Sequence, residues 1–130
     1  MANVNAGRKN VKPLKTVNIK GKEYVQVNER LKYFREHFAG WGITTEIIGG
    51  NENEVTMKAT VTRPDGTVAS TGHALEDRRA SYINKTSHIE NAETSAVGRA
   101  LGNLGIGLDT SVASAEEVEM AVARQEGANA

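Results

Sequence analysis

Residues 81–107 read SYINKTSHIENAETSAVGRALGNLGIG, and this stretch decides the fold. Ser87 and Glu90 have the S-x-x-E spacing of a capping box, in which each side chain satisfies a free backbone N–H of the first helical turn. Gly105 followed by Ile106 has the form of a glycine stop at a helix C-terminus. Between these signals, apolar residues recur at helical spacing and predict one buried face: Ile89, Ala92, Ala96, Val97, Ala100, Leu101 and Leu104.

The opposite face of this helix is small, since it carries Asn91, Ser95, Gly98 and Gly102. A glycine inside a soluble helix costs about 1 kcal/mol relative to alanine. We therefore expect a backbone, of the protein or of a nucleic acid, to approach this face closely. Glu93 lies in phase with the apolar face, so we expect it to form a salt bridge with another element or subunit.

The residues upstream predict a hairpin and a helix. Two β-prone pieces, TVNI and EYVQV, flank Lys20-Gly21-Lys22 and predict the hairpin within residues 17–27. Asn28 is the expected N-cap of a helix that ends at Phe38, with Leu31 and Phe34 facing inward.

A three-stranded meander should follow. Its expected strands are Ile43–Ile48, an alternating strand with Val55, Met57, Ala59 and Val61 inward, and Val68–Ala74. The last two strands are joined by Arg63-Pro64-Asp65-Gly66, where proline presets the first turn position and glycine adopts the positive φ.

After the long helix, Ser114 and Glu117 form a second capping box that predicts a short terminal helix. The whole order predicts an α+β domain, in which helices pack on one face of an antiparallel three-stranded meander preceded by a hairpin. We expect a flexible basic arm over residues 1–15, one domain over residues 16–124 and a tail over residues 125–130.

Composition excludes several classes of protein. The 130 residues contain no cysteine, which excludes disulfides and thiolate metal sites. No apolar run approaches the roughly 20 residues of a membrane span, and no signal peptide opens the chain, so we expect a cytoplasmic protein. Net charge is zero, but residues 1–22 are basic and the chain from Asp109 onward is acidic. This asymmetry indicates charge-guided self-association, a basic face for a polyanion, or simply two solvated termini.

One loop combines cations with an aromatic residue. Arg78, Arg79 and Lys85 surround Tyr82 in the sequence. Single-strand binders need this combination, because cations contact phosphates and a ring stacks on bases. The alternative is an ordinary solvated loop.

Signals for catalysis are weak. His73, Glu76, Asp77, His88, Glu90 and Glu93 do not have the spacing of metal ligands, and no glycine-rich segment matches a phosphate-binding loop. We therefore expect no enzyme activity, no cofactor and no nucleotide. A small metal-dependent enzyme that uses His73 and His88 remains an alternative.

The segment quoted first resembles a stretch of phage single-strand annealing proteins, which are related to the eukaryotic Rad-fifty-two family and to phage essential-recombination-function proteins. The resemblance extends more weakly over residues 22–107. It implies a β-β-β-α core, side-by-side assembly into a ring or filament, and single-stranded DNA in a basic groove between sheet and long helix. Arg99, in GRALG, matches the inner-groove arginine of that family, and Lys85 matches a lysine of an outer DNA contact.

The sequence departs from that family where further cations are expected. Gly98 and Gly102 replace two groove cations, and Glu29 replaces a third, with Arg30 beside it. We assign Arg30 and Lys58 to the DNA-binding set together with Arg78, Arg79, Tyr82, Lys85 and Arg99.

The resulting prediction is a homo-oligomer that binds single-stranded DNA and anneals complementary strands without ATP, in homologous recombination and DNA repair. If it is encoded by a phage, it should act in the cytoplasm of the bacterial host. The alternative is an oligomeric accessory subunit on the same fold without annealing activity.

Overall fold

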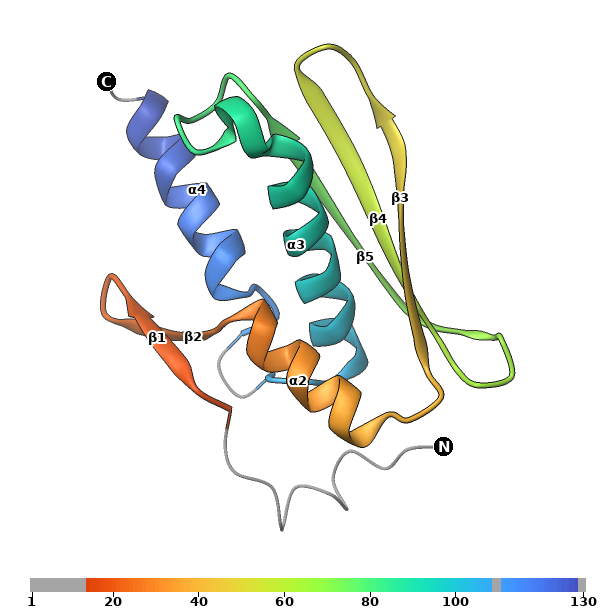
Figure 1. Cartoon of the computed structure of the whole chain (residues 1–130). Helices are drawn as coiled ribbons and strands as arrows, with labels where there is room; N and C mark the ends of the chain where they lie inside the picture. The colour runs from red at the N-terminus through yellow and green to blue at the C-terminus, as the bar shows by residue number, and fades with distance from the viewer. Residues whose placement is uncertain (1–13, 109–110, 129–130) are drawn as a thin grey trace.

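A computed structural model describes residues 14–108 and 111–128, and it has the predicted order of elements (Figure 1). The elements are β1 (Thr16–Ile19), β2 (Lys22–Val25), α2 (Val27–His37), β3 (Gly42–Gly50), β4 (Glu54–Thr62), β5 (Val68–Asp77), α3 (Asn84–Leu104) and α4 (Ala115–Ala128). Strands β3, β4 and β5 form an antiparallel sheet in sequence order, and the helices lie on one side of it. The predicted α+β class, hairpin, meander and long helix are confirmed.

The hairpin forms a separate two-stranded sheet, with Thr16 opposite Val25 and Ile19 opposite Lys22. Its turn places Lys20 at φ 51° and Gly21 at φ 89°. Positive φ at both central residues is the geometry of a type I′ turn, whose twist matches that of the flanking strands. The turn is fixed further by the side chain of Asn18, which accepts a hydrogen bond from the N–H of Gly21.

Helix α2 begins two residues earlier than predicted and is capped from another element. The residue before it is Gln26, and Asn28 lies inside the helix. The N–H of Val27 donates to Oε1 of Glu116, on α4, at 2.9 Å. A carboxylate at a helix N-terminus satisfies a free donor and interacts favourably with the helix dipole, so Asn28 is not needed as a cap.

The sheet has one buried face, and it is the face predicted from the alternation in β4. Val55, Met57, Ala59 and Val61 are all buried, while the residues between them are partly exposed. The turn between β4 and β5 also forms as predicted, since Gly66 has φ 89° and its N–H donates to the carbonyl of Arg63.

Helix α3 packs directly on β4 and β5. The closest approach is at Gly72, in the middle of β5, where an added Cβ would lie 2.6 Å from the carbonyl oxygen of Ala96. Any side chain at this position would push the helix off the sheet. This requirement was not recognised in the sequence.

The N-terminal end of α3 differs from the prediction. The helix begins at Asn84, and Ser87 interrupts it with φ −130° and ψ 22°. No hydrogen bond joins Ser87 and Glu90 in the described residues, so the predicted capping box is wrong. Ile89 follows this kink and is 41% exposed rather than buried. At the other end the glycine stop is confirmed, because Gly105 is left-handed and Ile106 is buried with its N–H bonded to Leu101.

The small face of α3 is covered by protein. An added Cβ on Gly98 would lie 2.6 Å from Cγ2 of Val27, and one on Gly102 would lie 2.9 Å from the carbonyl oxygen of Val112. The two glycines therefore admit α2 and the segment that precedes α4. This excludes the alternative that a nucleic acid occupies this face.

The terminal helix α4 opens with the predicted capping box. The N–H of Glu117 donates to Oγ of Ser114, and the N–H of Ser114 donates to Oε1 of Glu117. The helix continues to Ala128, through residues assigned to a tail. The predicted flexible arm falls almost entirely on residues 1–13, which lie outside the described residues. Among the described helices, none has the length and apolar character needed to span a membrane.

Candidate nucleic-acid interface

An open groove lies at the end of the molecule where β5 passes into α3. Its volume is about 600 Å³. It is lined by Asn53, Arg78, Arg79, Ser81, Tyr82, Lys85 and Thr86. Four of the seven residues assigned to DNA binding from the sequence, Arg78, Arg79, Tyr82 and Lys85, therefore lie together. We call this set of seven lining residues the basic groove.

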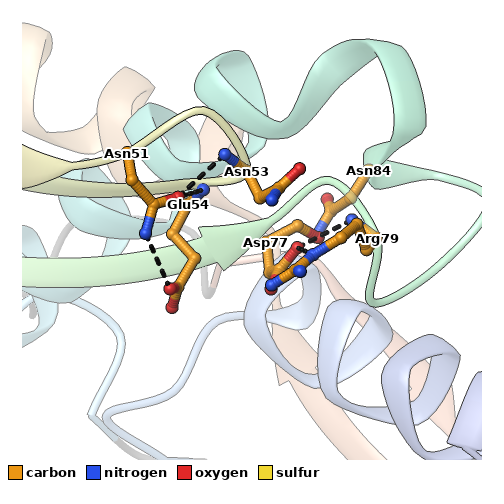
Figure 2. A network of polar contacts seen from close by, with 6 residues as sticks. All are labelled: Asn51, Asn53, Glu54, Asp77, Arg79 and Asn84. Carbon is orange, nitrogen blue, oxygen red and sulfur yellow. Dashed lines mark hydrogen bonds and ion pairs between the residues drawn. The ribbon is translucent and has the colours of Figure 1, made fainter.

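One wall of the groove is the loop between β3 and β4. The side-chain oxygen of Asn51 accepts hydrogen bonds from the N–H groups of Asn53 and Glu54, at 2.8 and 2.9 Å (Figure 2). Gly50 precedes this turn with φ 147°, and a side chain there would collide with the backbone of Glu54. The loop is thus fixed by its own sequence, which holds Asn53 at the groove.

The two loops are joined by the backbone. The N–H of Arg78 donates to the carbonyl of Asn53 at 2.9 Å, so the residue that follows β5 is bonded to the tip of the neighbouring loop. Asn53 and Arg79, both labelled in Figure 2, come from two separate loops and line the same groove. The groove is therefore a product of the tertiary fold, which explains why the sequence predicted its residues but not its second wall.

A buried polar network supports the floor of the groove. Asn84 is the first residue of α3 and is almost fully buried. Its side-chain N–H group donates to Oε2 of Glu76 at 2.5 Å, and its oxygen accepts from Asn91 at 2.9 Å. Arg124, on α4, lies 3.4 Å from Oε1 of the same glutamate. Because buried polar groups need partners, this network fixes where α3 begins and hence where Lys85 lies.

The cations of the groove differ in how they are paired. Asp77 holds Arg79 through two contacts, at 3.1 and 2.9 Å. The hydrogen bonds from Arg79 lower the pKa of Asp77 to about 2, and the same contact raises the pKa of Arg79. By contrast, no carboxylate of the described residues lies within 4.0 Å of the charged groups of Arg78 or Lys85. These two cations are available for an anion.

The groove also presents an aromatic ring and a helix N-terminus. Tyr82 is 90% exposed, the highest value among the large hydrophobic residues of the described chain. The first turn of α3 contains no acidic residue, but its N–H groups at Asn84 and Lys85 are already bonded to Ser81 and Tyr82. An anion approaching this end therefore meets positive charge from side chains.

The other residues assigned to DNA binding lie elsewhere. Lys58 is in the middle of β4, between Glu46 on β3 and His73 on β5. Arg99 is on α3, about 20 Å along the helix from Lys85 at 1.5 Å per residue. Its Nη1 lies 3.8 Å from Oε2 of Glu117, and its side chain is 41% exposed. The structure thus does not bring Arg99 and Lys85 into one groove, and it gives Arg99 a carboxylate partner, Glu117.

Arg30 cannot contact DNA, because it is fully buried. Its guanidinium donates hydrogen bonds to the backbone carbonyls of Gly98, Val112 and Ser111, at 2.7, 2.8 and 2.8 Å. Burial lowers its pKa, against the attraction of Glu117 and Glu116. The assignment from the sequence is therefore wrong, and the residue instead joins α2, α3 and the segment before α4. Gly102, which admits this side chain, was the available signal.

Glu93 has no salt-bridge partner among the described residues of its own chain. Its carboxylate accepts a hydrogen bond from the hydroxyl of Thr45, on β3, at 2.7 Å.

The two histidines considered for metal binding, His73 and His88, do not lie in a cluster of possible metal ligands within the described part of the chain. Among the described residues, no group of three His, Cys, Asp or Glu side chains is placed to hold a metal ion.

Comparison with known proteins gives one match. The family model described as Slr1353 N-terminal dsRNA-binding domain-like matches residues 31–104, more than half of the chain. These residues run from within α2 to the end of α3, an α-β-β-β-α order. No curated protein and no solved structure matches the chain. The resemblance to the single-strand annealing family was therefore misleading, since the family that matches is a different one.

Proposed function

Because the chain belongs to the Slr1353 N-terminal dsRNA-binding domain-like family, we propose that it binds nucleic acid, and that the basic groove contacts the phosphates of an RNA duplex. The observation that carries this proposal is that the cations Arg78, Arg79 and Lys85 line one groove together with Asn53, which comes from a separate loop. We propose binding rather than catalysis, with no nucleotide or metal required.

The chemistry of the groove suits recognition of a duplex by its backbone. A-form RNA is recognised mainly through its shape, its phosphates and its 2′-hydroxyls rather than through base sequence. Arg78 and Lys85 supply cations for phosphates, while Asn53, Ser81 and Thr86 supply amide and hydroxyl groups that can bond to a sugar hydroxyl.

A second candidate is single-stranded nucleic acid, and Tyr82 is the observation that favours it. A ring that is 90% exposed beside cations offers a surface on which an unpaired base can stack. Annealing of complementary strands and a place in recombination or repair were predicted from the sequence, and they depend on this candidate.

The test is a binding panel with fluorescently labelled duplex RNA, duplex DNA, single-stranded RNA and single-stranded DNA. Each should be roughly 20 nucleotides or base pairs long, which exceeds the ~16 base pairs that a double-stranded-RNA-binding domain spans. The proposal predicts that duplex RNA binds tightest and that affinity falls steeply with salt, as phosphate contact requires.

Other results of the panel decide between the alternatives. Preference for single strands, together with accelerated annealing of complementary strands, would replace the duplex proposal with the second candidate. Absence of binding to all four at low salt would overturn both and favour an accessory subunit.

A further inference from the structure

The outer edge of β3 is an edge of the sheet that no described strand covers. In the described part of the chain, β3 pairs with β4 alone, so one side of its backbone has no strand partner. At the other edge strand, β5, the side chain of Asn103 on α3 donates a hydrogen bond to the carbonyl of Thr71 at 2.7 Å. An edge with unpaired N–H and C=O groups is a template for pairing with another strand.

The sequence of β3 has few of the features that block such pairing. Its nine residues, GITTEIIGG, contain no proline and no lysine, and Glu46 is the one charged residue. Ile47 is 57% exposed and Ile48 is 49% exposed. Natural edge strands are usually blunted with lysine, proline or bulges, and here the bulge comes only at the far end, between Ile47 and Gly49.

From this we propose that two copies of the chain associate through their β3 strands, paired antiparallel about a two-fold axis at Thr45. This inference goes beyond the proposed function and does not depend on it. The two three-stranded sheets would join into one continuous sheet. An isologous contact of this kind closes at two copies.

The register follows from the side chains of β3. Pairing centred on Thr45 places Ile43 of each copy opposite Ile47 of the other, on the face that also carries the buried residues of β4. It places Thr44 opposite Glu46 on the other face. A register centred on Glu46 would oppose two like charges, and one centred on Thr44 would separate the isoleucines. Cross-strand apolar pairs stabilise a sheet and like charges oppose it, so Thr45 is the favoured centre.

The Glu93 side chain opposes the contact, and its charge gives the dimer a distinctive dependence on salt. The Glu93 carboxylate accepts a hydrogen bond from Thr45, so the two-fold axis brings the Glu93 side chains of both copies toward each other. Salt screens repulsion between partly exposed charges. Added salt should therefore strengthen the dimer, whereas it should weaken binding to nucleic acid. The opposite signs keep failure of this inference distinct from failure of the proposed function.

The first test measures mass and its dependence on β3. Sedimentation equilibrium of the full chain should give a particle of twice the 14.0 kDa mass at micromolar concentration. Ile47→Lys adds a charge to the edge and should raise the dimer dissociation constant by about tenfold or more. Val68→Lys is the matched control, because Val68 is 56% exposed and lies on β5. It should leave the constant unchanged.

The second test determines the register by disulfide trapping. The chain has no cysteine, so only the introduced thiols can cross-link. Thr45→Cys places two thiols on the axis, where opposite Cα atoms are about 4.5–5.5 Å apart, within reach of a disulfide. Thr44→Cys is the control, since two residues of offset separate its Cα atoms by about 8 Å, beyond that reach.

The inference predicts that mild oxidation cross-links the Thr45→Cys variant and spares Thr44→Cys. A monomer at all concentrations, equal cross-linking of the two variants, or a larger particle insensitive to Ile47→Lys would each overturn it.

Discussion

The guanidinium of Arg30, on α2, donates a 2.7 Å hydrogen bond to the backbone carbonyl of Gly98, in the middle of α3. The same side chain reaches the carbonyls of Ser111 and Val112, beyond the end of α3. One buried arginine thus joins three segments that are far apart in the sequence. Its place in the core depends on Gly102, where an added Cβ would lie 2.7 Å from Nη1 of Arg30.

Arg30→Leu should destabilise the fold by about 3 kcal/mol or more, because it leaves buried carbonyls without donors. Arg30→Lys should cause a smaller loss, since an ammonium group keeps the charge but cannot reproduce the planar set of donors. Urea denaturation followed by circular dichroism measures both. A leucine variant as stable as the parent chain would show that this network is dispensable.

Gly98→Ala and Gly102→Ala should each cost about 1–3 kcal/mol through overpacking. The added methyl groups would lie 2.6 Å from Val27 and 2.7 Å from Arg30. Gly49→Ala is a suitable control, because its Cβ would meet only Thr56, at 3.9 Å, and it should change stability by no more than about 0.5 kcal/mol. Equal effects at all three positions would argue against close packing on this face of α3.

Glu117 and Asp77 should change the stability of the fold in opposite directions as pH falls. Burial raises the pKa of Glu117 despite the attraction of Arg99. The folded state then binds this proton more tightly than the unfolded state, so stability should rise as pH falls toward the ordinary glutamate value. The pKa of Asp77 is lowered to about 2 by Arg79, so its contribution is present above the ordinary aspartate value and is lost as pH falls toward 2.

The comparison of Glu117→Gln with Asp77→Asn checks these signs. Thermal unfolding should be followed across pH 2 to 7. The stability of the glutamine variant should no longer rise on mild acidification, and the stability of the asparagine variant should fall less than that of the parent chain as pH approaches 2. Reversal of either effect would contradict the assignment of that group.

Tyr82→Ala separates the two candidate ligands of the basic groove. Stacking of a base on an aromatic side chain is worth about 1–3 kcal/mol, so single-strand affinity should fall by that amount if an unpaired base uses the ring. Duplex affinity should hardly change. Tyr82→Phe keeps the stacking surface and should restore single-strand binding. If the alanine variant binds single strands as well as the parent chain does, the second candidate fails.

Local signals were sufficient to predict most of the fold. The alternation in β4, the positive-φ turn at Gly66 and the stop at Gly105 each rest on short-range physics, and each is present in the structure. The start of α3 was not predictable in this way. It is set by the buried Asn84, whose hydrogen-bond partners Glu76 and Asn91 are eight and seven residues away in the sequence.

The candidate site was predictable only in part, for a similar reason. Arg78, Arg79, Tyr82 and Lys85 are near one another in the sequence, so their pattern was visible. The contribution of Asn53 depends on a hydrogen bond between loops, and the burial of Arg30 depends on contacts 68 to 82 residues away. A sequence shows that a residue is cationic, but not whether the fold turns it toward solvent or toward the core.

The central claim is that Arg78 and Lys85 contact phosphates in the basic groove, and the salt dependence of binding tests it most directly. Affinity of the best-bound nucleic acid should be measured over a range of salt for Arg78→Ala and Lys85→Ala. Lys22→Ala, at an exposed position of the hairpin, and Arg99→Ala, whose side chain faces Glu117, serve as controls. We predict that each groove variant lowers the slope of log affinity against log salt by roughly 0.7 on a single strand or 0.9 on a duplex, while both controls leave it unchanged. Equal slopes for the groove variants and the parent chain, or a slope that falls only in the controls, would contradict the account.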